Sequence, residues 1–187
     1  RVKFSLLTHE NRQYIAYYNA NRNMVVGQRD LTNNKFDLHV MPSPSRDKKS
    51  KERRERFSAT EIGWDSHNSI TMAVDKKGYI HLSGNMHVDS LTYFRTKKPE
   101  DITTLTQYFP MVGPKELKAT YPKFMYNKDQ DLVFHYRDGG SGNGNEIYNI
   151  YSTENKSWTR MLDVPLTDGQ GLMNAYQSQP TLGPDGW

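Results

Sequence analysis

Two short apolar runs flank a polar turn in the stretch Ser69-Ile70-Thr71-Met72-Ala73-Val74, Asp75-Lys76-Lys77-Gly78, Tyr79-Ile80-His81-Leu82-Ser83. Turn residues of this kind between alternating runs predict a β-hairpin. The same plan returns in Lys123-Phe124-Met125-Tyr126, Asn127-Lys128-Asp129-Gln130, Asp131-Leu132-Val133-Phe134-His135-Tyr136. It begins again in Gln179-Pro180-Thr181-Leu182, before the turn Gly183-Pro184-Asp185-Gly186. The turns start at residues 75, 127 and 183, so their spacings are 52 and 56 residues.

A fourth, degenerate copy of the hairpin lies at the front, in Phe4-Ser5-Leu6-Leu7, His9-Glu10-Asn11-Arg12, Gln13-Tyr14-Ile15-Ala16-Tyr17-Tyr18. Its turn precedes Asp75 by 66 residues, or by 55 when the eleven residues from Arg46 to Arg56 are set aside. More strand-like sequence follows the hairpins, in Met24-Val25-Val26-Gly27-Gln28, Leu91-Thr92-Tyr93-Phe94-Arg95, Glu146-Ile147-Tyr148-Asn149-Ile150-Tyr151 and Ser157-Trp158-Thr159-Arg160-Met161. Four strands in a repeat of this length are typical of a β-propeller blade.

The composition also favours an all-β class, because 12 Tyr and 7 Phe are present and helical apolar spacing is almost absent. We expect one partial propeller domain over 1–187, with blades near 1–60, 61–115, 116–170 and an incomplete one at 171–187. Three blades and part of a fourth cannot close a ring and would leave terminal sheet faces open. The chain is therefore expected to be an excerpt of a longer protein. Residues 98–111 are expected to form a short helix or a loop between blades.

The net charge comes from one segment of the chain. Residues 46–56 hold seven Lys/Arg against three Asp/Glu, a surplus of four that equals the formal charge of +4. Such an insertion is expected to be a solvated loop; contact with a sulfated or carboxylated polymer is the alternative, and nucleic acid is not expected as a partner. The absence of Cys excludes disulfides and thiol nucleophiles. No apolar run approaches the roughly 18 residues of a membrane span, so no membrane partner is expected.

Five polar side chains are expected at one rim of the sheets. In an antiparallel meander, the start of the first strand and the end of the second lie at the same edge, opposite the turn. His67, Tyr121 and Tyr176 each precede a first strand, and His87 and Arg137 each follow a second strand. Two imidazoles, a phenol and a guanidinium at the mouth of a central channel indicate a functional site.

The remaining polar features indicate structure rather than chemistry. His81 and His135 lie inside expected strands and are interpreted as structural histidines. The glycine-rich segment 139–145 opens no helix, so it does not fit a dinucleotide-binding fingerprint. His67 and His87 match no specific metal motif, and no carboxylate ligand is obvious beside them, so no metal site is predicted.

Four segments together resemble the BNR-repeat polysaccharide lyases, the family that includes the ulvan lyases. They are Trp64-Asp65-Ser66-His67-Asn68-Ser69, Gly78-Tyr79-Ile80-His81-Leu82-Ser83-Gly84-Asn85-Met86-His87, Thr120-Tyr121-Pro122-Lys123-Phe124 and Tyr136-Arg137-Asp138-Gly139-Gly140-Ser141-Gly142-Asn143-Gly144. The likeness runs from about Leu6 to Trp187. It implies a seven-bladed propeller more than twice this length, secreted or periplasmic, that acts on an acidic polysaccharide. The basic segment 46–56 is not a feature of that family.

The resemblance also implies roles for six residues. His67 and Tyr121 are implied as the acid/base pair, and Arg137 as the partner of the uronate carboxylate. His87, Tyr176 and Asn68 are implied as substrate-binding residues. No cofactor is required for this chemistry, and a structural divalent cation is not indicated.

The chemistry expected of these residues is β-elimination at a uronic acid. Arg137 can pair bidentately with the carboxylate and stabilise the enolate-like charge that develops when the C5 proton leaves. An imidazole such as His67 suits the base and the Tyr121 phenol suits the acid, although the two roles can be exchanged. The alternatives are a non-catalytic carbohydrate-binding propeller and a sialidase-like hydrolase, which would need a nucleophilic Tyr and several rim arginines.

Overall fold

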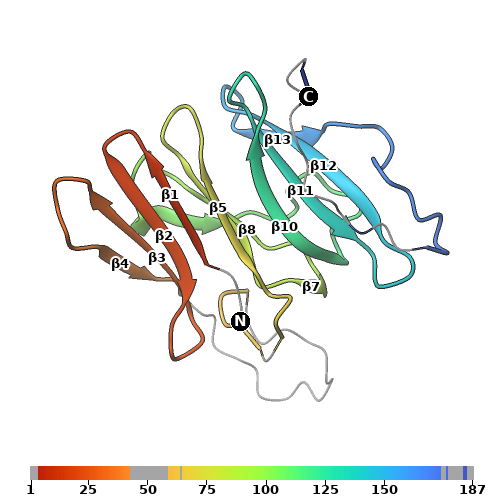
Figure 1. The fold of residues 1–187 in the computed structure, drawn as a ribbon, viewed down its shortest axis with the longest axis horizontal. Helices are drawn as coiled ribbons and strands as arrows, with labels where there is room; N and C mark the ends of the chain where they lie inside the picture. The colour runs from red at the N-terminus through yellow and green to blue at the C-terminus, as the bar shows by residue number, and fades with distance from the viewer. Residues whose placement is uncertain (1–3, 43–58, 64, 174–175, 177–182, 185–187) are drawn as a thin grey trace.

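The computed structural model describes residues 4–42, 59–63, 65–173, 176 and 183–184, and this part of the chain is all-β. Three sheets of antiparallel strands follow one another along the chain (Figure 1). None of the described residues forms a helix long and apolar enough to cross a membrane. The all-β expectation is therefore confirmed, while the boundaries expected for the blades stay a prediction.

The first sheet is a four-stranded meander in the order β1-β2-β3-β4. Its strands are β1 (Ser5–His9), β2 (Arg12–Tyr18), β3 (Met24–Asp30) and β4 (Asp37–Val40). The hairpin expected at the front of the chain is confirmed, since Leu7 pairs with Tyr14 across β1 and β2. Glu10 in its turn has a positive φ of 50°, which closes the hairpin within two residues.

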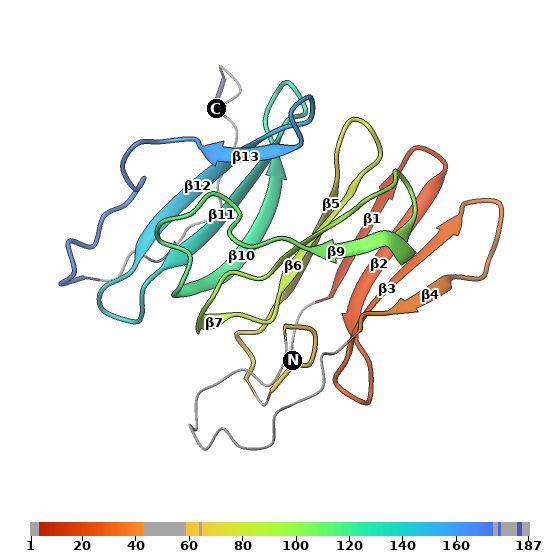
Figure 2. The same cartoon turned by 180° about the vertical axis from the view of Figure 1, so that it is seen from behind.

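The second sheet contains the hairpin predicted in residues 69–83. It has the order β5-β6-β8-β9, with β5 (Ile70–Val74), β6 (Ile80–Gly84), β8 (Tyr93–Thr96) and β9 (Leu105–Gln107). Segment 98–111, expected to be a short helix or a loop, holds a 3₁₀ turn, η1 (Ile102–Thr104), and then the fourth strand (Figure 2). Asp101 caps η1 by accepting a hydrogen bond from the Thr103 amide.

The third sheet has five strands, in the order β13-β12-β11-β10-β7. They are β7 (His87–Asp89), β10 (Ala119–Tyr126), β11 (Leu132–Asp138), β12 (Asn145–Ser152) and β13 (Ser157–Arg160). The short β7 follows the second strand of one sheet but pairs with β10 at the edge of the next sheet. This exchange ties the two sheets together at one rim.

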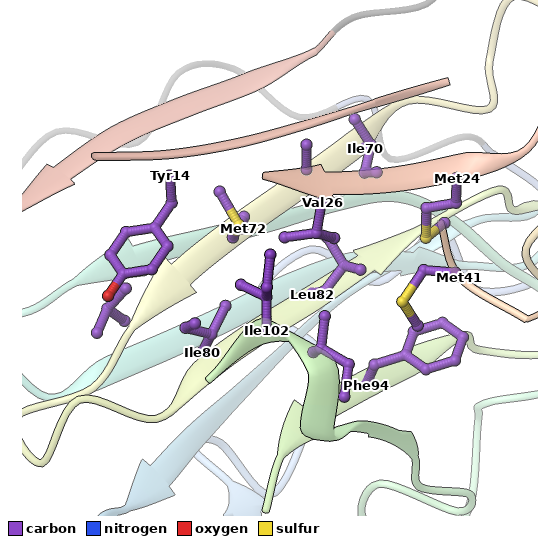
Figure 3. Packing of buried hydrophobic residues seen from close by; sticks show 13 residues of the cluster. Tyr14, Met24, Val26, Met41, Ile70, Met72, Ile80, Leu82, Phe94 and Ile102 are labelled. Carbon is purple, nitrogen blue, oxygen red and sulfur yellow. The ribbon is translucent and has the colours of Figure 1, made fainter. Parts of the chain in front are cut away.

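Two apolar clusters fill the spaces between neighbouring sheets. The first, shown in Figure 3, packs side chains such as Tyr14 and Val26 of the first sheet against Met72 and Leu82 of the second. The second packs residues such as Tyr93 against Phe134, Tyr136 and Trp158 of the third sheet. Burying each large apolar side chain contributes about 1.5–3 kcal/mol. The sheets therefore stack face to face, as the alternation of apolar residues along the strands requires.

The hairpin turns and the ends of these hairpins lie at opposite edges of the stack. The β1–β2, β5–β6 and β10–β11 turns lie at the upper edge in Figure 1, and β7 lies at the lower edge. The hairpin expected at 179–186 lies outside the described residues, apart from Gly183 and Pro184. The basic segment 46–56 also lies outside them. Among the described residues on either side of it, the Thr60 hydroxyl donates a 2.9 Å hydrogen bond to the Pro42 carbonyl.

Candidate functional site

Two histidines stack against each other at the lower rim and share one carboxylate. The rings of His67 and His87 are 4.0 Å apart between centroids and inclined by only 20°. His67 Nδ1 lies 2.6 Å from Asp65 Oδ1, and His87 Nδ1 lies 2.5 Å from Asp65 Oδ2. A carboxylate can only accept hydrogen bonds, so both Nδ1 atoms carry the hydrogen. Neither Nε2 atom makes a hydrogen bond to the described residues.

A local turn and a strand edge place these three side chains. Asp65 Oδ1 also accepts a 2.9 Å hydrogen bond from the His67 amide, the two-residue contact of an Asx turn. His87 begins β7 and pairs in register with Thr120 of β10. The Thr120 hydroxyl accepts a 2.7 Å hydrogen bond from the Val88 amide, which fixes the backbone directly after His87.

The Asp65 carboxyl is held in its ionised form. Burial raises its pKa, but the hydrogen bonds from the His67 backbone and from both imidazoles, together with charge on His87, outweigh burial. The net result is a pKa lowered to about 2. The Asp65 carboxylate is therefore a fixed negative charge next to the Nδ1 atoms of both imidazoles.

Tyr121 reaches the site from a bulge inside β10. We expected it just before the strand, but it lies within β10, where the pairing with β11 shifts register between Thr120 and Lys123. Its φ is 57°, a strained value for a residue other than glycine. Such a bulge re-aims a side chain out of the regular alternation. As a result, the Tyr121 ring lies 5.8 Å from the His67 ring between centroids.

Arg137 lies between two tyrosine rings. We expected it after the end of β11, but it is inside that strand and is only 3% exposed. Its guanidinium carbon is 4.9 Å from the centre of the Tyr121 ring and 6.0 Å from that of Tyr176. Nη2 donates a long 3.4 Å hydrogen bond to the Thr120 hydroxyl, and Nε has no partner among the described residues. This guanidinium therefore has hydrogen-bond donors that no described residue uses.

Tyr176 and Asn68 occupy the margins of the site. Tyr176 is 66% exposed, and its hydroxyl lies 3.5 Å from the Ser141 hydroxyl of the glycine-rich segment. Asn68 is only 6% exposed, and its Oδ1 is buried without a partner among the described residues. Its backbone amide donates a 3.4 Å hydrogen bond to the Asp65 carbonyl, which ties Asn68 to the turn that carries His67. The structure thus brings four residues together directly, with Tyr176 and Asn68 at the edge.

Asp65, His67 and His87 are also the described residues whose ligand atoms could converge on a metal ion, since these atoms lie within 4.8 Å of one another. The sequence interpretation that no carboxylate stands near the histidines is wrong, because Asp65 is bonded to both. However, two ligands of a tetrahedral zinc ion are about 3.3 Å apart. The observed separations of 2.6 and 2.5 Å are those of hydrogen bonds instead.

The two strand histidines are buried, as the sequence predicts. His81 contacts Asp75 Oδ2 through Nε2 at 3.4 Å and accepts a 2.9 Å hydrogen bond from the Tyr93 hydroxyl at Nδ1. Burial lowers the pKa of His81. Burial also lowers the pKa of His135 to about 3, with a smaller effect of Lys123. Burial thus favours the neutral form of both imidazoles. His81 has the hydrogen-bond partners of a structural histidine, whereas neither ring nitrogen of His135 has a partner among the described residues.

Sequence reasoning missed two residues of the site, Asp65 and Thr120. The sequence offers one general signal for Asp65, since an Asp side chain commonly accepts a hydrogen bond from the backbone amide two residues on, here that of His67. Thr120 carries no such signal. Its role depends on the edge pairing of β7 with β10, which joins segments more than 30 residues apart.

Comparison with known proteins places this site in context. The model of the BNR repeat-containing family matches residues 12–187. A curated protein, the long isoform of ulvan lyase from Glaciecola sp. (strain KUL10), is 24% identical over 159 residues, covering 64% of this chain and 16% of that protein.

Two solved structures share the fold. The polysaccharide lyase Uly1 superposes with a TM-score of 0.68 at 18% identity, covering 83% of this chain and 40% of that one. A PL25 ulvan lyase bound to -[GlcA(1-4)Rha3S]- superposes with a TM-score of 0.62 at 14% identity, covering 87% and 36%. The chain thus spans less than half of the length of each of these relatives.

Proposed function

Because this chain belongs to the BNR repeat-containing family, we propose that it is part of a β-propeller polysaccharide lyase that cleaves an acidic, uronate-containing polysaccharide of the ulvan type by β-elimination. The three described sheets correspond in this proposal to three blades, near 1–60, 61–115 and 116–170, and residues 171–187 would belong to an incomplete fourth. The protein would meet its polymer outside the cytoplasm, as a secreted or periplasmic enzyme.

One observation carries the proposal: a buried guanidinium with unused donors lies beside two imidazoles and a phenol. Arg137 lies 4.9 Å from the centre of the Tyr121 ring, and Tyr121 lies 5.8 Å from His67. A uronate needs a planar cation for its carboxylate, a base for its C5 proton and an acid for its leaving oxygen. The cluster contains at least one group of each kind.

Arg137 would make the C5 proton removable. That proton is a poor acid because the neighbouring carboxylate resists further negative charge. Two parallel N–H···O bonds from the guanidinium to the carboxylate stabilise the charge that develops as the proton leaves. Since Arg137 is 3% exposed, little water competes for its donors, and the interaction is stronger than it would be at the surface.

His67 and Tyr121 would carry the two proton transfers. The Nε2 lone pair of His67 takes the C5 proton, the C5–H electrons form the C4–C5 double bond, and the C4–O bond breaks. The Tyr121 hydroxyl then protonates the departing glycosidic oxygen. The two residues exchange these roles if the C5 proton lies on the tyrosine face of the sugar. His87, Tyr176 and Asn68 would line the same subsite, with the unused Asn68 oxygen accepting from a sugar hydroxyl.

The composition of the cluster favours a lyase over a sialidase-like hydrolase. A propeller sialidase needs a nucleophilic tyrosine with a glutamate partner and three arginines on the rim. Among the described residues, Arg137 is the arginine that contacts Tyr121. Arg95 donates to the Tyr151 hydroxyl and Arg160 to the Tyr136 hydroxyl, so these two arginines are not part of the cluster.

The experiment is incubation of the full-length protein with a panel of uronate polymers, followed by UV absorbance. An increase from the unsaturated product on at least one polymer supports the proposal, and Tyr121→Phe is the matched variant that should remove it. New reducing ends without UV absorbance would instead identify a hydrolase. Polymer binding without any cleavage would identify a non-catalytic carbohydrate-binding protein.

A further inference from the structure

Asp65 is bonded to both members of the histidine pair at the same time. Its two oxygens lie 2.6 Å from Nδ1 of His67 and 2.5 Å from Nδ1 of His87, and each oxygen serves one ring. The rings are stacked with centroids 4.0 Å apart, so the carboxylate spans the edge of the stack. Among the described residues, the Asp65 carboxylate is the side chain to which both imidazoles are hydrogen-bonded.

This arrangement determines the tautomer of both rings. An ionised carboxylate accepts hydrogen bonds and donates none, so each Nδ1 must carry a hydrogen. In a neutral imidazole the lone pair is then on Nε2. Both rings consequently direct their basic nitrogen away from Asp65, with no competing hydrogen bond from the described residues.

We propose that Asp65 is a positioning residue that holds His67 and His87 as one unit, each with Nδ1 protonated and Nε2 presented to the substrate. The inference rests on the proposed function for its kinetic consequence and on geometry alone for the tautomers. Asp65 acts through the two histidines and touches no reacting atom. Carboxylates that orient a metal-bound histidine typically contribute about 10- to 100-fold to activity, and we expect an effect of this size here.

Asp65→Asn is a selective perturbation because the local turn tolerates it. Asn keeps an oxygen that can accept from the His67 amide, so the Asx turn is preserved. Its amide group, however, offers a donor where the second oxygen was. Because the oxygen that Asn keeps also faces His67 Nδ1, the imidazole that must then accept through Nδ1 is that of His87. Its hydrogen moves to Nε2, which removes its lone pair from the substrate side.

The chain contains a matched control at Asp75. Asp75 Oδ1 accepts from the Lys77 and Tyr79 amides, and Oδ2 contacts His81, so it combines a turn with a histidine contact at the opposite rim. The following hairpin has Asn127 at this position, where Asn127 Oδ1 accepts a 2.8 Å hydrogen bond from the Asp131 amide. Asp75→Asn therefore changes an Asp–His pair away from the site in a turn that accommodates Asn.

The experiment measures imidazole tautomers and turnover in the full-length protein. Long-range proton–nitrogen NMR at a pH where the imidazoles are neutral should show His67 and His87 with Nδ1 protonated, with signals assigned by His67→Ala and His87→Ala. In Asp65→Asn at least one of the two signals should switch to the Nε2-protonated pattern, and kcat should fall about 10- to 100-fold with KM nearly unchanged. Asp75→Asn should leave both signals and kcat as in the parent.

Two results separate this inference from the proposed function. If the tautomers switch in Asp65→Asn but the parent cleaves no uronate polymer, the positioning role stands and the lyase proposal fails. If the tautomers remain unchanged in Asp65→Asn, or if kcat is unchanged although they switch, Asp65 does not position the pair for catalysis and the inference is overturned. A melting temperature for each variant confirms that the compared proteins are folded.

Discussion

Replacing Arg137 with lysine keeps a positive charge at the site but removes the planar fork that two parallel hydrogen bonds require. In the structure, the guanidinium uses one long 3.4 Å bond to Thr120 and lies over the Tyr121 and Tyr176 rings. A lysine ammonium at this position can meet the uronate carboxylate with a single hydrogen bond. The substitution therefore separates charge from geometry.

The expected loss can be derived from what the second hydrogen bond does. Loss of a donor that stabilises charge in the transition state lowers kcat about 10²–10³-fold, or roughly 3–4 kcal/mol. The stacking on the tyrosine rings, about 0.5–2 kcal/mol, is present before and during the reaction, so its loss affects stability and KM instead. We therefore predict that Arg137→Lys lowers kcat far more than it raises KM.

The assay is initial-rate measurement of unsaturated product across polymer concentrations, with circular dichroism to verify folding. Arg160→Lys is the control, because Arg160 donates to the Tyr136 hydroxyl and the Asn149 side chain in the packing of the third sheet. It should lower the melting temperature and leave kcat of the folded protein unchanged. A wild-type kcat for Arg137→Lys on every polymer that the parent cleaves would refute the carboxylate-clamp reasoning.

Three further substitutions test other parts of the structure. Tyr121→Phe removes the hydroxyl and keeps the ring over Arg137, so activity should be nearly lost while the melting temperature is retained; residual wild-type turnover would assign the proton transfer to another group. Thr120→Val leaves the Val88 amide without its acceptor, which should cost about 1–3 kcal/mol of unfolding free energy and also lower kcat, as measured by denaturant titration and rate assays; an unchanged stability would show that β7 is held by other contacts. His135 has a folded pKa lowered to about 3, so between about pH 6.5 and 3 the unfolded state binds the additional proton and stability falls as the pH falls. His135→Phe should therefore flatten this acid-side slope in denaturant titrations across that pH range, and an identical slope in parent and variant would exclude His135 as its source.

The hairpins could be predicted from the sequence because their determinants are local. In residues 69–83, alternation of apolar residues and a turn of four polar residues specify both strands, and Ile70 to Val74 pair with Ile80 to Gly84 in the structure. The position of a residue relative to its hairpin turn also determines its rim. That local rule is sufficient to predict that His67, His87, Tyr121 and Arg137 lie at one edge.

The exact contacts within the site could not be predicted in the same way. The sequence places Tyr121 before its strand, whereas β10 begins two residues earlier and carries the bulge that turns its ring toward His67. Strand ends depend on which neighbouring strand supplies hydrogen bonds, and here the additional neighbour is β7. The pairing of β7 with β10 joins segments that are distant in sequence, and it produces no periodic pattern in either of them.

By itself, the sequence determined the all-β class, the spacing of the hairpins and the rim on which the polar residues gather, since each follows from patterns within a few consecutive residues. Only the tertiary structure decided that Asp65 serves two histidines, that Thr120 supports both Val88 and Arg137, and that Arg137 lies between two tyrosines. These contacts join residues of different strands and loops, and 22 positions separate Asp65 from His87. Their distances are determined by the stacking of whole sheets on their apolar faces, which no local pattern specifies.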